Sequence, residues 1–118
     1  MTAPLVVNGL SFANEVLKSD LPVLIDVTAD WCPPCQAAAP IVAELAQRHA
    51  GRLKVVVIDG NDSPDLVAAL GVRGFPTFLG VLSSEVVARQ AGFGGRRGLE
   101  ALADKLLASA GAQPGANA

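Results

Sequence analysis

The stretch Trp31-Cys32-Pro33-Pro34-Cys35 contains the only two cysteines of this 118-residue chain. The apolar run Val23–Thr28 precedes it, and a helical pattern from Cys32 to about His49 follows it. Two thiols separated by two residues at the start of a helix are typical of a redox site. The stretch therefore predicts a buried strand, a tight turn that carries both thiols, and a long helix.

A second segment, Val72-Arg73-Gly74-Phe75-Pro76-Thr77, places Pro76 41 positions after Cys35. Together the two segments resemble the thioredoxin family, whose active site combines a Trp-Cys-x-x-Cys turn with a cis-proline loop. The resemblance covers about residues 5–108. It implies an α/β, thioredoxin-like fold: a mixed five-stranded β-sheet flanked by helices on both faces.

The hydrophobic pattern leads to the same architecture independently. Apolar runs alternate with helical patterns in the order β-α-β-α-β-α-β-β-α, which favours parallel crossovers first and an antiparallel hairpin last. We expect strands at about 5–7, 23–28, 53–58, 77–82 and 86–90, and helices at about 12–18, 32–49, 65–70 and 99–107. Ser11 is a candidate N-cap for the first helix, and residues 92–98 are expected to form a loop.

Length and composition indicate one domain. With 118 residues, of which 51% are hydrophobic, the chain can bury a substantial core. We expect a thioredoxin-like domain over residues 1–109. Residues 110–118, which are Gly, Ala, Gln, Pro and Asn, are expected to form a disordered C-terminal tail.

Charge and hydropathy exclude several classes of partner. The net charge of −2 gives no reason to expect nucleic acid or a membrane surface, and no apolar run approaches the roughly 20 residues that cross a bilayer. The first residues lack the pattern of a secretory signal, so we expect a cytoplasmic, monomeric protein. A periplasmic or otherwise exported protein is the alternative, if a signal peptide was removed.

The position of the thiols suggests separate roles for them. Cys32 at the helix N-terminus faces unpaired backbone N–H groups and the positive end of the helix dipole, which favour the thiolate. We therefore expect Cys32 to be the exposed nucleophile and Cys35, one turn further on, to be the shielded resolving thiol. A buried, inert pair is the alternative. A structural zinc site is disfavoured because two Cys and one His cannot supply four ligands, so we expect no metal and no cofactor beyond the Cys32–Cys35 pair.

Asp26 is a carboxylate within an otherwise apolar strand, six residues before Cys32. The resemblance implies that Asp26 lies beneath Cys35, has a pKa raised by desolvation and acts as its general base. The alternative is a carboxylate at the strand end that reaches solvent or caps the next helix. The lysine that often accompanies this aspartate in the family is missing, since Val55 stands at the corresponding point and Lys54 should face the other way.

The resemblance also implies a substrate surface around the thiols. Pro76 would form a cis peptide bond, and the backbone of Phe75 would pair with an extended substrate segment. The alternative is a trans proline that opens the next strand. The substrate-binding residues expected on this basis are Trp31, Pro34, Gly74, Phe75, Pro76 and Gly92.

These features predict an enzyme, a thiol-disulfide oxidoreductase that reduces protein disulfides through Cys32 and Cys35. Its partners would be disulfide-containing proteins and an electron donor similar to thioredoxin reductase. Pro33 and Gln36 differ from the residues usual in thioredoxins. Two alternatives therefore stay open: an oxidase or isomerase of an oxidising compartment, and a redox-inert protein-binding module.

Overall fold

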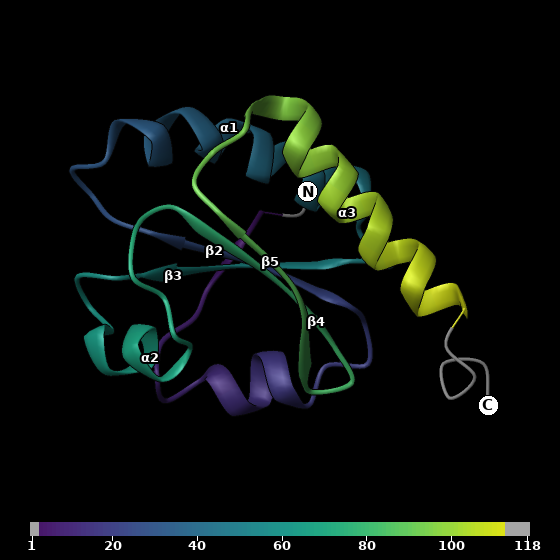
Figure 1. Ribbon diagram of the computed structural model, residues 1–118. Coiled ribbons are helices and arrows are strands. Elements are labelled where there is room, and N and C mark those ends of the chain that lie inside the picture. Colours follow the sequence, from purple (N-terminus) through teal and green to yellow (C-terminus); the bar gives the residue numbers. More distant parts are fainter. Residues whose placement is uncertain (1–2, 113–118) are drawn as a thin grey trace.

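A mixed sheet forms the central layer of the computed structural model, which describes residues 3–112 (Figure 1). The strand order is β1-β3-β2-β4-β5; β1, β3 and β2 run parallel, and β4 and β5 are antiparallel to their neighbours. The strands are β1 (Leu5–Val6), β2 (Val23–Thr28), β3 (Lys54–Asp59), β4 (Thr77–Leu82) and β5 (Glu85–Ala91).

Helices cover both faces of this sheet (Figure 1). α1 and α3 lie on one face, and η1 and α2 lie on the other. Their bounds are η1 (Ala13–Leu17), α1 (Pro33–Arg48), α2 (Pro64–Ala69) and α3 (Gly95–Ala112). The expected fold class and element order are confirmed. None of the helices within residues 3–112 is long and apolar enough to cross a membrane.

The central strand β2 is buried on both of its faces, which explains its nearly continuous apolar sequence. Side chains alternate along a strand, so Leu24 contributes to the core beneath α1 and α3, whereas Ile25 and Val27 contribute to the core beneath η1 and α2. Asp26 therefore points to the same side as Leu24. β2 ends at Thr28, and residues 29–32 lead from it into α1.

The last helix is longer at both ends than the sequence pattern indicates. It begins at Gly95, inside the stretch expected to be a loop, because glycines at 95 and 98 mask the helical pattern. It continues to Ala112, and Ala110 packs against the core beneath α1 and α3. The expected tail is therefore wrong for residues 110–112, which are helical, and residues 113–118 lie outside the described part of the chain.

The first helical segment also differs from its expected form. η1 has π-helical hydrogen bonding over Ala13–Leu17, and Phe12 rather than Ser11 occupies the N-cap position. The Ser11 hydroxyl instead accepts a hydrogen bond from the Asn8 amide over 3.1 Å and lies 3.3 Å from Asn8 Oδ1. Local hydrogen bonds of Ser and Asn side chains compete with helix capping in this way.

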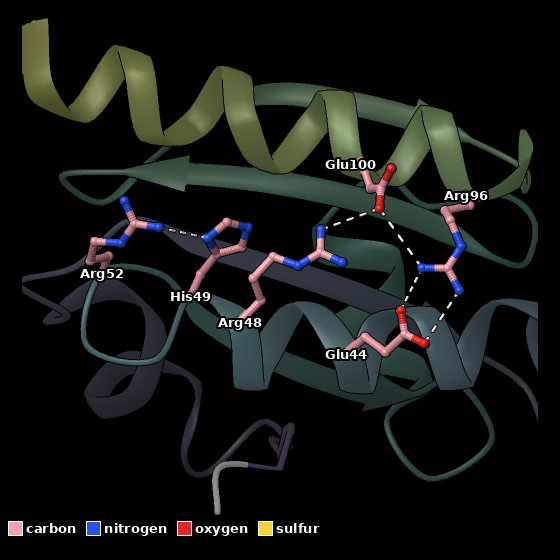
Figure 2. A network of polar contacts seen from close by, with 6 residues as sticks. All are labelled: Glu44, Arg48, His49, Arg52, Arg96 and Glu100. Atoms are coloured by element: carbon pink, nitrogen blue, oxygen red, sulfur yellow. Dashed lines mark hydrogen bonds and ion pairs between the residues drawn. The ribbon is translucent and has the colours of Figure 1, made fainter.

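An ionic network joins α1 and α3 on the molecular surface (Figure 2). The Arg96 guanidinium donates to both carboxylate oxygens of Glu44, over 2.5 and 3.3 Å, and Arg48 donates to Glu100 over 3.2 Å. The hydrogen bond from Arg96 lowers the pKa of Glu44. Such exposed pairs stabilise a fold only slightly, and this set connects the first turns of α3 to the C-terminal half of α1.

Candidate active site

The two thiols stand where β2 ends and α1 begins. Cys32 has an extended backbone, with φ −107° and ψ 107°, and serves as the N-cap of α1. Its Sγ accepts a hydrogen bond from the Cys35 amide over 3.3 Å. Pro33 and Pro34 fill the first helical positions, where a residue without an N–H fits well. One backbone donor of the first turn therefore points at the Cys32 sulfur.

Cys32 and Cys35 are joined in a disulfide. The exposed fraction is 6% for Cys32 and 2% for Cys35, whereas the neighbouring Trp31 is 73% exposed. Both cysteines are therefore buried in this oxidised form, and the expected exposure of Cys32 is not found, because Cys32, Cys35 and Ala29 pack together with Phe75.

A cis peptide bond joins Phe75 to Pro76 next to the disulfide, as the resemblance implied. The carbonyl oxygen of Phe75 lies 3.6 Å from Sγ of Cys32. Oxidised Sγ carries no hydrogen, so this is a van der Waals contact in the disulfide form. In the reduced form the Cys32 thiol has a hydrogen that it can donate to this oxygen. The loop is fixed by two further bonds: Thr77 Oγ1 donates to the Gly74 carbonyl over 2.7 Å, and the Gly92 amide donates to the Pro76 carbonyl over 2.8 Å.

The ring of Phe75 points into the protein. It packs against the disulfide and against the core beneath η1 and α2. A Cβ atom placed on Gly60 would overlap Cε1 and Cζ of this ring. Gly60 thus leaves the space that the Phe75 ring occupies. Phe75 is predictable from the sequence, whereas the only signal for Gly60 is its place in a turn-rich loop.

Four of the six expected substrate-binding residues come together. Gly74, Phe75, Pro76 and Gly92 line a hollow of about 330 Å³ beside the cis-proline loop. The structure does not bring the other two into this hollow. Trp31 and Pro34 are exposed residues that flank Cys32 in the turn before α1 and in its first positions.

Asp26 is buried, with 3% of its surface exposed, and its Oδ1 has no hydrogen-bond partner. The alternative of a solvent-exposed or capping carboxylate is therefore wrong. The residues that pair with Asp26 in the neighbouring strands are Val57 on β3 and Phe78 on β4. Because Asp26 is buried, its pKa is raised to about 7. Lys54 instead binds Glu15 over 3.1 Å, so it does not compensate the charge of Asp26.

The turn that carries Trp31 is tied to the loop after β3. The Asp30 amide donates to Oδ1 of Asn61 over 3.4 Å, and the Gly60 amide donates to the Thr28 carbonyl over 2.7 Å. Gln36 donates to the Asp30 carbonyl over 3.3 Å. Asn61 was also missed from sequence, because its contact with Asp30 joins residues of different loops.

The described residues, 3–112, hold no group of three or more His, Cys, Asp or Glu side chains that could bind a metal ion. The site itself holds the two sulfur atoms of Cys32 and Cys35. A carboxyl group with a pKa near neutrality lies in the strand before them. A disulfide at a helix N-terminus with such a carboxyl defines a dithiol-disulfide oxidoreductase site.

Comparison with known proteins agrees with this site. The thioredoxin family model matches residues 3–108. Thioredoxin 1 of Nostoc sp. is 42% identical over 79 residues, which are 67% of this chain and 74% of that protein. The thioredoxin of Haemophilus influenzae is 40% identical over 92 residues, 78% of this chain and 86% of that protein. The thioredoxin of Thiocapsa roseopersicina is 46% identical over 78 residues, with coverage of 66% and 86%.

This chain belongs to the thioredoxin family. Its Cys32–Cys35 pair makes it a dithiol-disulfide oxidoreductase, and thioredoxins are protein-disulfide reductases. The predicted family, fold and class of enzyme are thus confirmed.

Proposed function

We propose that Cys32 attacks the disulfide of a protein substrate and that Cys35 resolves the product. The hydrogen bond from the Cys35 amide to Cys32 Sγ carries this assignment, because it and the dipole of the 16-residue helix α1 favour a thiolate at Cys32. Attack joins Cys32 to one substrate sulfur, and the other substrate sulfur leaves as a thiolate. Cys35 then attacks Cys32 Sγ, and the first substrate sulfur leaves as well.

Two electrons and two protons pass to the substrate in this cycle, and the enzyme ends in its disulfide form. We assign Asp26 as the group that accepts the Cys35 proton. Burial brings its pKa to about 7, which suits a base that works near neutral pH. The sulfur pair itself carries the electrons, so the cycle uses no cofactor.

Trp31, Pro34, Gly74, Phe75, Pro76 and Gly92 form the proposed substrate-binding surface. An extended substrate segment would pair with the backbone of Phe75, beside the Cys32 sulfur that its carbonyl oxygen contacts at 3.6 Å. The side chain of Phe75 supports this backbone from below, because it packs on the disulfide.

Reduction, rather than oxidation, is the direction that the first turn of α1 favours. Strong oxidants of this class owe their high reduction potential to a stabilised thiolate in the reduced form. Here Pro33 and Pro34 have no backbone N–H, so the Cys35 amide is the backbone donor of this turn to Cys32 Sγ. The Cys32 thiolate is therefore not stabilised as it is in a strong oxidant. We therefore expect a reduction potential nearer to about −270 mV than to about −120 mV. We infer a monomer that acts in the cytoplasm and receives electrons from a donor similar to thioredoxin reductase.

Equilibration of the protein in glutathione buffers, followed by an insulin-reduction assay, tests this function. We expect a low reduction potential and catalysed precipitation of insulin chains in the presence of dithiothreitol. A Cys32→Ser variant should be inactive. A reduction potential near that of strong oxidants would indicate an oxidase instead. A wild-type protein without exchange activity would indicate a redox-inert binding module.

A further inference from the structure

Two arginines, Arg73 and Arg89, border the hollow beside the cis-proline loop, and no carboxylate does. Arg89 donates to the carbonyl oxygens of Leu70 and Gly71, over 2.8 and 3.5 Å. These acceptors fix the position of the guanidinium but carry no net charge. Among the described residues, none forms an ion pair with Arg73 or Arg89.

Unlike three other cations of the chain, these two arginines form no ion pair within the described residues. The net charge is −2, and Arg48, Lys54 and Arg96 each pair with a glutamate. The two arginines of the hollow, by contrast, lie next to the backbone that is proposed to hold the substrate. An arginine guanidinium binds a carboxylate through two parallel hydrogen bonds, which gives both attraction and geometric selectivity.

We propose that this hollow binds a carboxylate side chain of the protein substrate, two or three residues from the reactive cysteine. This inference rests on the proposed function, because it places the substrate segment beside Phe75. It makes Arg73 the residue that selects acidic substrate segments, with Arg89 as a second, fixed positive charge at the same hollow.

The spacing follows from the contact between Cys32 and Phe75. The Phe75 carbonyl oxygen lies 3.6 Å from the Cys32 sulfur, so the substrate cysteine must approach close to Phe75. Arg73 precedes Phe75 by two residues, and two residues of chain span at most about 7 Å. A substrate residue two or three positions from the cysteine can therefore bring its carboxylate to Arg73.

The size of the selectivity is limited by exposure. Arg73 and Arg89 are exposed residues, so an ion pair formed here competes with water. Pairs of this kind change a rate or affinity by about two- to fivefold. Added salt should weaken the preference, since the Debye length falls to roughly 3 Å at 1 M.

Short peptides with one cysteine, held as a mixed disulfide with 2-thiopyridine, provide the test. They carry Glu, Gln or Lys at one position, two or three residues before or after the cysteine. Reduced protein attacks the peptide sulfur, and the released thiopyridone is followed optically. Second-order rate constants are compared within each variant: wild type, Arg73→Gln, Arg73→Glu and Lys18→Gln. Lys18 is an exposed cation at the C-terminal end of η1, outside the lining of the hollow, and serves as the control.

For at least one position of the variable residue, we expect wild type to react about two- to fivefold faster with the Glu peptide than with the Gln peptide. The Lys peptide should react slowest, and Lys18→Gln should show the same order as wild type. The Glu/Gln ratio should fall to about one in Arg73→Gln, and Arg73→Glu should prefer the Lys peptide. Equal rates for Glu, Gln and Lys peptides in wild type at low salt would overturn the inference but leave the reductase function intact. A Glu/Gln rate ratio in Arg73→Gln equal to that of wild type would also overturn the inference and leave the reductase function intact. Failure of every peptide to react would refute the proposed function, and this inference with it.

Discussion

Sγ of Cys32 lies 3.6 Å from the carbonyl oxygen of Phe75, although 43 residues separate them in the sequence. The first comes from the N-terminus of α1 and the second from the cis-proline loop before β4. The reactive sulfur is therefore in contact with the backbone segment that is proposed to bind the substrate. Any change that moves either segment should alter both reactivity and substrate binding.

Brief alkylation of the reduced protein should label Cys32 before Cys35. Cys32 caps α1, where the thiolate is stabilised, and Cys35 is 2% exposed. We expect at least about a tenfold difference in rate at pH 7, measured by mass spectrometry after iodoacetamide treatment. A Cys35→Ser variant is the control and should react at a similar rate. Faster labelling of Cys35 would reverse the assigned roles.

Replacement of Asp26 by Asn should stabilise the protein above pH 7. The folded-state pKa of Asp26, about 7, lies above the ordinary carboxyl value of 3.8, so between these values the unfolded state loses its proton first. The free energy of unfolding therefore falls as pH rises from about 4 to about 7 and is then constant, a change of roughly 4 kcal/mol at most. Urea denaturation of both proteins at pH 4 and pH 8 should show a gap that opens with pH.

The same Asp26→Asn variant should turn over more slowly, by about 10- to 100-fold near neutral pH, because the proposed base is gone. The loss should become smaller as pH rises, because solvent hydroxide then competes with Asp26 as the base. Insulin reduction as a function of pH measures this. A variant that is less stable than wild type yet fully active would show that Asp26 has a structural role only.

Replacement of Gly60 by Ala should destabilise the protein by about 1–3 kcal/mol, the usual cost of overpacking. The added Cβ would overlap the Phe75 ring, whereas a Cβ at Gly9 meets nothing within 4 Å. Gly9→Ala is thus the matched control, and urea denaturation is the measurement. Combining Gly60→Ala with Phe75→Ile should recover part of the loss, since the smaller side chain vacates the overlap. Equal stabilities for the two alanine variants would disprove this packing.

Local sequence patterns were sufficient to predict much of this structure. The apolar run around Asp26 predicted a central strand, and two thiols one helical turn apart predicted the redox pair. The burial of the Asp26 carboxylate followed from the family resemblance. The element order followed from alternating strand and helix patterns, because each pattern reports burial within a short segment. The cis bond at Pro76 came from the family resemblance.

Contacts between distant loops could not be predicted in this way. The fit between Gly60 and the Phe75 ring, and the bond from the Asp30 amide to Asn61, depend on distances that the fold alone sets. The low helix propensity of Gly98 argued against a helix that begins before Leu99. Packing of α3 on the core outweighs this propensity, so the helix begins earlier. The burial of Cys32 in the oxidised form has the same origin, because Phe75 packs against it from a distant loop.

Trapping of a mixed disulfide tests the central claim most directly. Reduced Cys35→Ser and Cys32→Ser variants are each incubated with insulin and resolved on non-reducing gels, and the adduct is mapped by mass spectrometry. We expect Cys35→Ser to accumulate a covalent adduct through Cys32, since the resolving thiol is absent. We expect Cys32→Ser to form little or none, because its remaining thiol is buried. An adduct that forms equally in both variants, or only through Cys35, would contradict the proposed mechanism.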